Sequence, residues 1–440
     1  MRVVLAVVLL LAGCGDNARG NISINGPAQW RGVFGDFVTF TEYRGLSLGT
    51  DGDFQIEIVQ DPSIPDEGYR IDRPVPAADG RDQPIIYTVA ARDVLGAQYG
   101  AAAVLEDLGF RFRHPFDTYS PREPKAGAEG LLDHAVHAPQ IRLRGLQLHT
   151  LHPIEGYFAF WEPSPGSTND ARHIIDWLIK NRGNYLQWVG LDNIMEPMAH
   201  EKWQAFTRAL IDYAHMRGVK VGLNVQLFGK SNLQLAFDLY DNENISLAQS
   251  LSERLPLITK ELPFDIYDLS FGEFFNSEPQ KFIDSTNQVA TQLRSLAPAS
   301  EMHAVVHVGA TQRVQYDNRD LLYYFLVQYT DASIIPDIHT VMFYNLVDDA
   351  GGAYQHDNFF EHRDYITQRM CAGQRVAYFP ETAYWVAFDD SVPMYLPLYV
   401  YSRWTDLKYL ADQAAQPGCV PLDEHLLFST GWSGATGSTT

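Results

Sequence analysis

Two glutamates follow strand-like segments in a way that suits acid–base chemistry on a single substrate. Glu273 lies in FDIYDLSFGEFFNSEP, after an alternating segment that begins at Phe264 and before turn and helix-start residues that end at Pro279. Glu381 follows the apolar run 376–379 in RVAYFPETAYW. Two carboxyl groups that flank one bond, one protonated and one ionised, are the usual machinery of glycoside hydrolysis. The elements around the two glutamates must therefore bring them together.

From residue 139 onward, strand-like and helix-like segments alternate regularly. The predicted strands are 141–149, 185–191, 220–228, 264–271, 302–309, 339–346, 375–381 and 425–432. The predicted helices are 171–183, 201–218, 245–262, 279–296, 319–330, 359–373 and 399–413. This count predicts an α/β fold, a (β/α)8 TIM barrel. Glu273 and Glu381 then end strands four and seven at the carboxyl-terminal rim, where barrel enzymes do their chemistry.

The predicted barrel spans 138–440 and follows a small α+β accessory domain at 22–137. Within that domain, 37–43, 54–59 and 85–91 read as strands and 96–110 as a helix, and the Pro- and Gly-rich stretch 115–130 reads as a loop or linker. A doubly wound sheet fits less well, because no glycine-rich phosphate turn follows the first barrel strand. The sequence predicts that the barrel's last helix is missing, since only SGATGSTT follows the eighth strand.

The first residues read as an export signal. Arg2 precedes an apolar core at 3–11 that is too short to span a bilayer, and Leu11-Ala12-Gly13-Cys14 matches a bacterial lipobox. We expect 1–14 to be a lipoprotein signal peptide with lipidation at Cys14. The predicted location is the bacterial cell envelope, lipid-anchored, with Gly15 favouring the outer membrane. The alternative is an ordinary secretory signal in which the cysteine is incidental.

Cysteine usage and charge narrow the chemistry further. Cys371 and Cys419 form an even pair that an oxidising compartment would allow to join in a disulfide, although two free buried thiols fit the sequence almost as well. The 54 Asp and Glu against 33 Lys and Arg disfavour nucleic acid or anionic lipid as a partner. The 12% aromatic content supplies flat, polar-edged surfaces on which sugar rings stack, or simply large aromatic cores.

Several stretches resemble glycoside hydrolases with an accessory domain before a barrel, namely the family 20 β-hexosaminidases and the α-glucuronidases. The segment YTVAARDVLGAQYGAAAVLEDLGFRFRHP is similar to their accessory-domain helix, and RGLQLH to their first barrel strand, with His149 in place of an aspartate. NYLQWVGLD is similar to their second strand, with Val189 in place of a histidine. The resemblance covers most of the chain and implies a carbohydrate substrate.

The resemblance also assigns roles to the two glutamates. Family 20 enzymes carry an Asp-Glu pair after the fourth strand, where this chain has Gly272-Glu273. The proton-donating Glu is kept, and the missing Asp argues against a substrate-assisted mechanism. Retaining enzymes with similar barrels place an acid/base after strand four and a nucleophile after strand seven. In those enzymes an Asn precedes the acid/base residue, whereas this chain has Gly272 at that position. The resemblance thus implies Glu273 as acid/base and Glu381 as nucleophile.

Other polar and aromatic residues near predicted strand ends are candidates for sugar contacts. Arg144 could equally be a structural ion-pair partner, and each of the others could be packing. A metal site of His149, His307 and Asp348 lacks a compact ligand motif, and no metal or cofactor is expected. The candidate substrate-binding residues are Arg144, His149, Trp188, Asp192, His307, Tyr344, Asn345 and Trp385.

The sequence therefore predicts a glycoside hydrolase acting on a polysaccharide or glycan. Two rivals remain open: a non-catalytic carbohydrate-binding surface lipoprotein, and a substrate-assisted β-N-acetylhexosaminidase. No G-x-S-x-G elbow or P-loop supports a serine hydrolase or a nucleotide enzyme. The sugar, the linkage, the stereochemical outcome, the oligomeric state and the activity of a chain without an eighth helix stay open.

Overall fold

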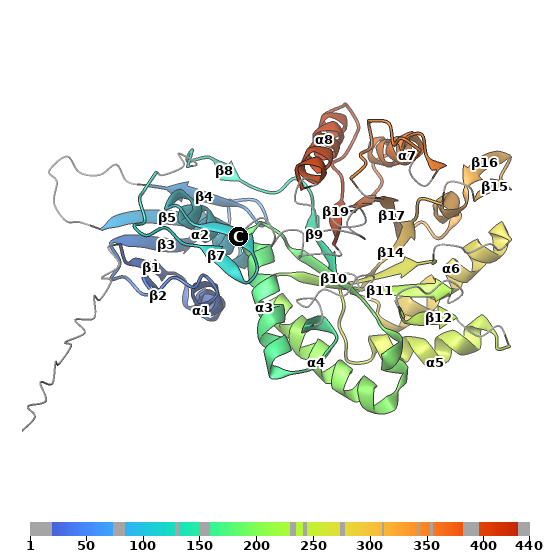
Figure 1. The fold of residues 1–440 in the computed structure, drawn as a ribbon, viewed down its shortest axis with the longest axis horizontal. Coiled ribbons are helices and arrows are strands. Elements are labelled where there is room, and N and C mark those ends of the chain that lie inside the picture. The colour runs from blue at the N-terminus through green and yellow to red at the C-terminus, as the bar shows by residue number, and fades with distance from the viewer. Residues whose placement is uncertain are drawn as a thin grey trace, which may run out of the picture.

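The computed structural model of the protein consists of an N-terminal sheet domain and a barrel (Figure 1). The structure describes residues 20–73, 84–127, 132–148, 159–228, 235–240, 244–272, 278–309, 312–341, 343–352, 355–381 and 396–429. Cys14, His149, Glu273 and Trp385, which carry sequence predictions, lie outside these ranges.

Eight parallel strands close into a barrel, which confirms the predicted (β/α)8 fold. Closure occurs where the last strand pairs with the first, with Leu426 opposite Gly145. Only glycine fits at 145, because a Cβ there would lie 1.7 Å from the carbonyl oxygen of Tyr185 on the neighbouring strand. A short ninth strand, β12 (Asp238–Tyr240), pairs with the outer part of β11. The barrel strands are β9 (Leu143–Leu148), β10 (Tyr185–Val189), β11 (Lys220–Phe228), β13 (Ile266–Ser270), β14 (Glu301–Val306), β17 (Ile334–Thr340), β18 (Ala377–Pro380) and β19 (Glu424–Ser429).

The helices around the barrel begin where the sequence places caps and first-turn prolines. Ser164 and Ser246 accept hydrogen bonds from backbone N–H groups at the starts of their helices, and three helices begin with proline, whose missing N–H costs nothing there. The helices are α3 (Pro165–Lys180), α4 (Pro197–Met216), α5 (Leu247–Thr259), α6 (Pro279–Leu296), α7 (Phe360–Cys371) and α8 (Leu396–Ala414), with the 3-10 turn η3 (Asp192–Met195) before α4. Within the described residues, no helix is long and apolar enough to cross a membrane.

The sixth barrel strand lies earlier in the chain than predicted. We expected it at 339–346, but β17 occupies Ile334–Thr340. The prediction failed because Pro336 lies inside the strand, paired with Ala304 of β14, at a position where proline usually argues against a central strand. As a result, Tyr344 and Asn345 lie in the loop after the strand rather than on it.

The helix predicted at 319–330 is also wrong. The chain instead forms an antiparallel hairpin, β15 (Arg313–Tyr316) and β16 (Arg319–Leu322), followed by the 3-10 helix η5 (Tyr323–Tyr329). Asp317 and Asn318 both have positive φ, 49° and 56°, as a two-residue hairpin turn that matches the strand twist requires. This turn signal outweighs the helical spacing of the apolar residues that follow it.

The N-terminal domain is a mixed six-stranded sheet in the order β2-β1-β3-β5-β4-β8. The segment 37–43, predicted as a strand, instead holds the end of a helix at 37–39 and a turn at 40–42, because Val33, Phe34 and Phe37 form one buried helical face. Part of the predicted loop 115–130 forms a hairpin. The elements are β1 (Ile22–Asn25), η1 (Ala28–Trp30), α1 (Arg31–Thr39), β2 (Leu46–Leu48), β3 (Phe54–Gln60), β4 (Tyr69–Asp72), β5 (Ile85–Ala91), α2 (Val94–Asp107), β6 (Arg111–His114), β7 (Asp117–Tyr119) and β8 (Val136–His137).

A buried ion cluster joins the N-terminal domain to the barrel. Asp176 of α3 contacts Lys180 at 2.5 Å and Arg217, just after α4, at 2.7 Å, and all three side chains are almost fully buried. Lys180 also donates to the carbonyl of Phe37 at the end of α1, and Arg217 donates to Gln98 of α2. Burial lowers the pKa of Lys180, which the charge of Asp176 opposes. One carboxylate therefore holds two buried cations that bridge four helical segments.

The disulfide prediction is confirmed. Cys371 at the end of α7 is bonded to Cys419, which precedes β19. The two cysteines meet because β18, which follows Cys371, and β19 are neighbouring parallel strands.

Candidate active site

The barrel mouth collects three polar side chains from neighbouring strands. Inward-facing positions alternate along a strand, and Val305 and Phe379 belong to the apolar cluster inside the barrel. The same alternation points His307 after β14, His339 of β17 and Glu381 after β18 inward at the carboxyl-terminal rim. The rings of His307 and His339 stack with centroids 5.1 Å apart, and Nε2 of His339 lies 3.6 Å from Oε1 of Glu381.

Both the backbone N–H and the backbone carbonyl of Glu381 form hydrogen bonds. Its N–H donates to the carbonyl of Thr340 at 3.0 Å, which extends the pairing with β17 by one residue. Its carbonyl accepts from Nη1 of Arg403 on α8 at 2.5 Å. The residue is 3% exposed. These two backbone hydrogen bonds therefore fix the position of the main chain from which the Glu381 side chain extends.

The structure describes the chain after β13 as far as Gly272, the residue before Glu273 in the sequence. Gly272 follows β13 with φ of +73°, a left-handed conformation that favours glycine over the Asp of family 20 enzymes. Its carbonyl accepts a hydrogen bond from the Tyr324 hydroxyl at 2.7 Å. The positive φ of Gly272 and this hydrogen bond, the tyrosine clamp, thus fix the backbone at Gly272.

Tyr324→Phe is expected to lower turnover about tenfold without loss of the fold, because Gly272, the residue before the candidate catalytic Glu273, loses the hydrogen bond that fixes its carbonyl. The ring still packs against His307 and Tyr323, so the free energy of unfolding should fall by only about 1 kcal/mol. Steady-state kinetics and urea unfolding of the variant measure both effects. An unchanged turnover number would show that the clamp has no part in catalysis.

The mouth histidines are neutral at ordinary pH. Burial lowers the pKa of His339 to about 4, despite the hydrogen bond between its Nδ1 and the carbonyl of Phe379 at 2.8 Å. Burial and the nearby His339 and His356 lower the pKa of His307 to about 3. Burial likewise places the pKa of His362 well below its ordinary value. Within the described ranges, no three His, Cys, Asp or Glu side chains are placed to hold a metal ion.

Two of the residues predicted to contact the sugar do not lie at the barrel mouth. Arg144 points outward near the start of β9, where it pairs with Glu67 of the N-terminal domain at 2.5 Å and donates to Tyr99 at 3.1 Å. Arg144 is therefore the structural ion-pair partner that the sequence left open, and it lies at the end of the barrel away from the mouth. Trp188 also points outward, is 1% exposed, and packs against Phe160 and Phe264. Both corrections follow from side-chain alternation, which places even-numbered residues of β9 and β10 outside the barrel.

The remaining predicted contacts lie around the rim. Asp192 is exposed at the start of η3, directly after β10. Tyr344 is half-buried, and its carbonyl accepts a hydrogen bond from Arg403, which places it near Glu381. Asn345 uses its own side chain to close a local turn, accepting from the N–H groups of Val347 and Asp348. His307 lies at the mouth as predicted.

His339, Arg403 and Tyr324 were missed by sequence reasoning. The misplaced sixth strand hid His339, which in the correct register falls one position before the strand end. The other two come from α8 and η5 and meet the rim only through the fold. Their sequence neighbourhoods carry no catalytic pattern.

A second polar layer lies inside the barrel, beneath the mouth. His303 of β14 is fully buried, with Nδ1 3.3 Å from Oε2 of Glu424. Asp268 of β13 accepts a hydrogen bond from Asn224 at 2.9 Å, whereas neither carboxyl oxygen of Asp337 has a hydrogen-bond partner within the described part of the chain. Burial raises the pKa of Asp268, raises that of Asp337 well above its ordinary value, and raises that of Glu424 to about 7. These acids therefore favour their protonated forms.

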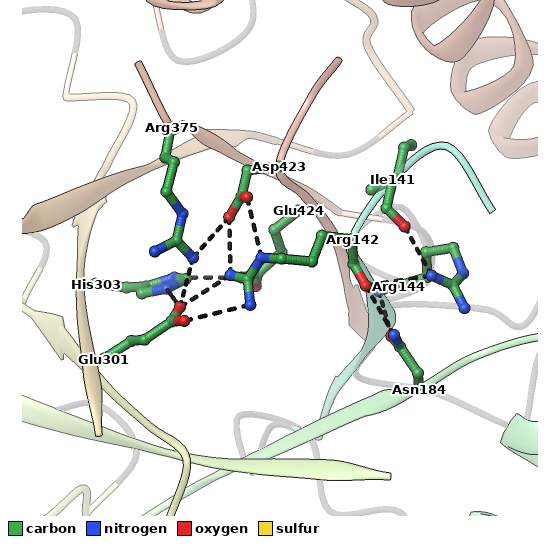
Figure 2. Close-up of polar contacts among 9 residues, drawn as sticks. All are labelled: Ile141, Arg142, Arg144, Asn184, Glu301, His303, Arg375, Asp423 and Glu424. Atoms are coloured by element: carbon green, nitrogen blue, oxygen red, sulfur yellow. Dashed lines mark hydrogen bonds and ion pairs between the residues drawn. The ribbon is translucent and has the colours of Figure 1, made fainter. Parts of the chain in front are cut away.

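An ion-pair cluster closes the barrel floor below this layer (Figure 2). The guanidinium groups of Arg142 and Arg375 both reach the carboxylates of Glu301 and Asp423 within 2.6 to 3.0 Å. Burial opposes ionisation of Glu301, but His303, 3.6 Å away, and the guanidinium groups of Arg375 and Arg142 hold its pKa well below the usual range. The cluster sits at the amino-terminal ends of β14 and β19, so we assign it to stability rather than to substrate.

The inner layer predicts a stability that falls as pH rises. Raised carboxyl pKa values mean that the folded state binds more protons than the unfolded chain above pH 4, so stability is lost as pH climbs through the folded-state values. His303, whose pKa is also raised, acts in the same direction. The lowered pKa values of Glu301 and Asp423 matter only below about pH 4. The contribution of this inner layer to stability should therefore decline between pH 5 and pH 8, whereas the lowered pKa values of His307, His339 and His362 act in the opposite direction below about pH 6.5.

Asp337→Asn should remove part of this decline. The amide cannot ionise, so the variant is expected to exceed the native protein in free energy of unfolding by about 1–3 kcal/mol at pH 8 and to lose that advantage at pH 5. Urea unfolding at both pH values measures the difference. The exposed Asp412→Asn on α8 is the control and should leave both values unchanged. An Asp337→Asn variant that is less stable at pH 8 would contradict this account.

The fold is shared with known glycosidases at low sequence identity. The structure aligns with the GH20 β-N-acetylhexosaminidase from Streptomyces coelicolor A3(2), with a TM-score of 0.54 and 13% identity. The alignment covers 95% of this chain and 83% of that enzyme. A β-hexosaminidase mutant from Streptomyces plicatus aligns over 94% and 82%, with a TM-score of 0.55 and 13% identity. The GH115 4-O-methyl-α-glucuronidase BtGH115A aligns over 96% of this chain and 56% of its own, with a TM-score of 0.53 and 11% identity.

The chain thus spans about four fifths of the two hexosaminidases and little more than half of the glucuronidase. No family model matches the sequence, and no curated protein matches it either. These likenesses define the class of fold, a TIM barrel behind a sheet-containing N-terminal domain. They confirm the architecture that the sequence resemblance implied.

Proposed function

We propose that this protein is a glycoside hydrolase that acts on a polysaccharide or glycan, with Glu273 and Glu381 as its carboxyl pair. The observation that carries the proposal is the placement of Glu381: it faces inward at the carboxyl-terminal rim beside a neutral histidine, in a fold shared with glycosidases. Glu273 follows Gly272 in the sequence, after β13, and β13 is three strands around the barrel from β18. This arrangement suits two carboxyl groups on either side of a glycosidic bond.

The chemistry needs one protonated and one ionised carboxyl group. The protonated group gives its proton to the glycosidic oxygen as the bond to the anomeric carbon breaks. The ionised group either attacks that carbon or takes a proton from the attacking water. A separation of about 5–5.5 Å between the carboxyl groups gives retention of configuration, and about 6.5–9.5 Å gives inversion.

The proposal is tested by incubating the purified protein with a panel of bacterial, plant and animal glycans and following the release of reducing ends. Turnover that disappears in both Glu273→Gln and Glu381→Gln supports the proposal. Binding of a glycan without turnover would instead favour the rival, a carbohydrate-binding lipoprotein. The hexosaminidase alternative is supported only if N-acetylglucosaminides are cleaved and a thiazoline-type inhibitor blocks the reaction.

We further propose that the chain is exported and anchored through a lipid on Cys14. The Leu-Ala-Gly-Cys sequence and the Cys371–Cys419 disulfide both support an envelope location, because such bonds persist in oxidising compartments. Expression of the full chain with labelled fatty acid should label the protein, and Cys14→Ala should abolish the label and release the protein from membranes. A soluble, unlabelled native protein would contradict the anchor.

A further inference from the structure

A cavity of about 600 Å³ lies at the floor end of the barrel, between the first residues of β17 and the last turns of α7. A second cavity, of about 230 Å³, adjoins it, and the two share Ser333, Ile335 and Arg375 in their linings. The larger cavity has the size of a small-molecule site. Because it lies at the amino-terminal end of β17, a molecule bound there would not occupy the mouth, where the strands have their carboxyl-terminal ends.

The charges that line the two cavities do not cancel within the described part of the chain. Arg294 pairs with Asp331 at 3.4 Å. Arg375 pairs with Glu301 at 2.6 Å (Figure 2). Arg369, the third arginine in the linings, forms no ion pair with a described carboxylate, since its Nε donates to a backbone carbonyl. One uncompensated positive charge therefore lies at the larger cavity, in a chain whose formal net charge is −21.

The end of α7 holds Arg369 in place against the cavity. Gly373 follows the helix with φ of +68°, the left-handed helix end that glycine adopts without strain. The chain then turns back, so that Nε of Arg369 donates to the carbonyl of Arg375 at 3.0 Å. The disulfide between Cys371 and Cys419 ties the same turn to the segment before β19. The guanidinium group therefore has little freedom left to lose when it binds a ligand.

The carboxyl-terminal end of a helix ordinarily disfavours an anion, because its last carbonyls are unpaired. In α7 two of these carbonyls accept backbone hydrogen bonds. The carbonyl of Arg369 accepts from the N–H of Gln374 at 2.9 Å, and that of Met370 accepts from the N–H of Val420 at 3.0 Å. The partial negative charge that remains at the helix end is smaller than the full positive charge of Arg369. The balance at this end of α7 thus favours an anion.

The lining also has an apolar part, which comes from η5, β17 and α7. It consists of Val327, Ile334, Ile335 and Tyr365. A guanidinium group can donate two parallel hydrogen bonds to a carboxylate, a geometry that a neutral group of the same shape does not reward equally. The apolar side chains suit a hydrocarbon or aromatic body. The two parts together match a molecule that carries its carboxylate on an apolar body.

We infer that this cavity binds a small organic acid, with the carboxylate held by Arg369 and the apolar body against the start of β17. The inference does not depend on the proposed hydrolase, because no residue of the mouth takes part in it. A neutral molecule of the same shape would lack the attraction of Arg369. A small inorganic anion would leave the apolar lining unused.

Calorimetric titration of the full chain with benzoate tests the site. Benzamide serves as the neutral molecule of the same shape, and inorganic phosphate as the anion without an apolar body. Benzoate should bind one-to-one and about tenfold or more tightly than either, because a hydrogen bond to a charged group is lost in the first and the apolar contact in the second. Benzamide or phosphate that binds as tightly as benzoate, or benzoate that does not bind, overturns the inference.

Two variants locate the bound benzoate. Arg369→Gln should weaken its binding about tenfold or more. Since that change also removes the hydrogen bond to Arg375, Ala372→Glu provides a second test: Ala372 is exposed in the lining, and the new carboxylate should repel benzoate or pair with Arg369 in its place. Arg44→Gln, an exposed arginine of the N-terminal domain, is the control for loss of one positive charge and should bind benzoate like the native protein. Binding that is unchanged in both Arg369→Gln and Ala372→Glu places benzoate elsewhere and overturns the inference.

Discussion

Glu273→Gln is expected to reduce turnover of a glycan substrate by about 10³-fold or more while leaving its binding affinity within about threefold. The amide is nearly isosteric with the carboxyl group, so the sugar still fits the mouth. It can neither attack an anomeric carbon nor take or give a proton in the working pH range. The loss should therefore appear in kcat rather than in KM.

Turnover assays and calorimetric titration of the same variant measure the two quantities. Glu253→Gln, an exposed glutamate on α5, is the matched control for loss of one negative charge and should behave like the native protein. A Glu273→Gln variant with native turnover would show that this residue has no catalytic role. Glycan binding by both proteins without turnover by either would identify a carbohydrate-binding protein instead.

Asp176→Asn should be the most destabilising single change among those considered, lowering the free energy of unfolding by about 3–5 kcal/mol. The carboxylate of Asp176 compensates two buried cations, Lys180 and Arg217. With an amide in its place, both cations lose their counter-charge in a region that excludes water. Because Lys180 reaches α1 and Arg217 reaches α2, the contact between the N-terminal domain and the barrel should loosen as well.

The control for Asp176→Asn is Asp212→Asn, which breaks a half-exposed pair with Arg208 on the neighbouring helix α4. That pair should contribute no more than about 0.5 kcal/mol, since solvent screens it. Urea unfolding followed by tryptophan fluorescence and by limited proteolysis reports the barrel and the domain contact separately. Equal and small losses in the two variants would show that the buried cluster is not needed to hold the domains together.

The sequence pattern predicted correctly those strands and helices whose residues alone determine their limits. The strand 220–228 and the helix 279–296 were placed at their observed limits, because each has an uninterrupted pattern and clear boundary residues. The sixth strand was displaced because Pro336 breaks the local rule and only pairing with both neighbours overrides it. The hairpin turn at Asp317-Asn318 was overlooked in favour of the apolar spacing that follows it.

The candidate site was predicted only in part, because its partners meet through the barrel rather than through the sequence. Strand-end position was enough to propose Glu381 and His307, which do lie at the mouth. Alternation, applied strictly, would have placed Trp188 outside the barrel. The buried acids Asp268, Asp337 and Glu424 each look like ordinary strand residues, and only closure of the barrel brings them around one interior.

The most direct test is the separation of two side chains in a crystal structure of the protein with a bound sugar. The account predicts that the carboxyl groups of Glu273 and Glu381 face the same sugar ring at about 5–10 Å from each other, with the glycosidic oxygen within reach of one of them. Carboxyl groups that point to different regions of the surface, or a sugar that binds away from both, would contradict it.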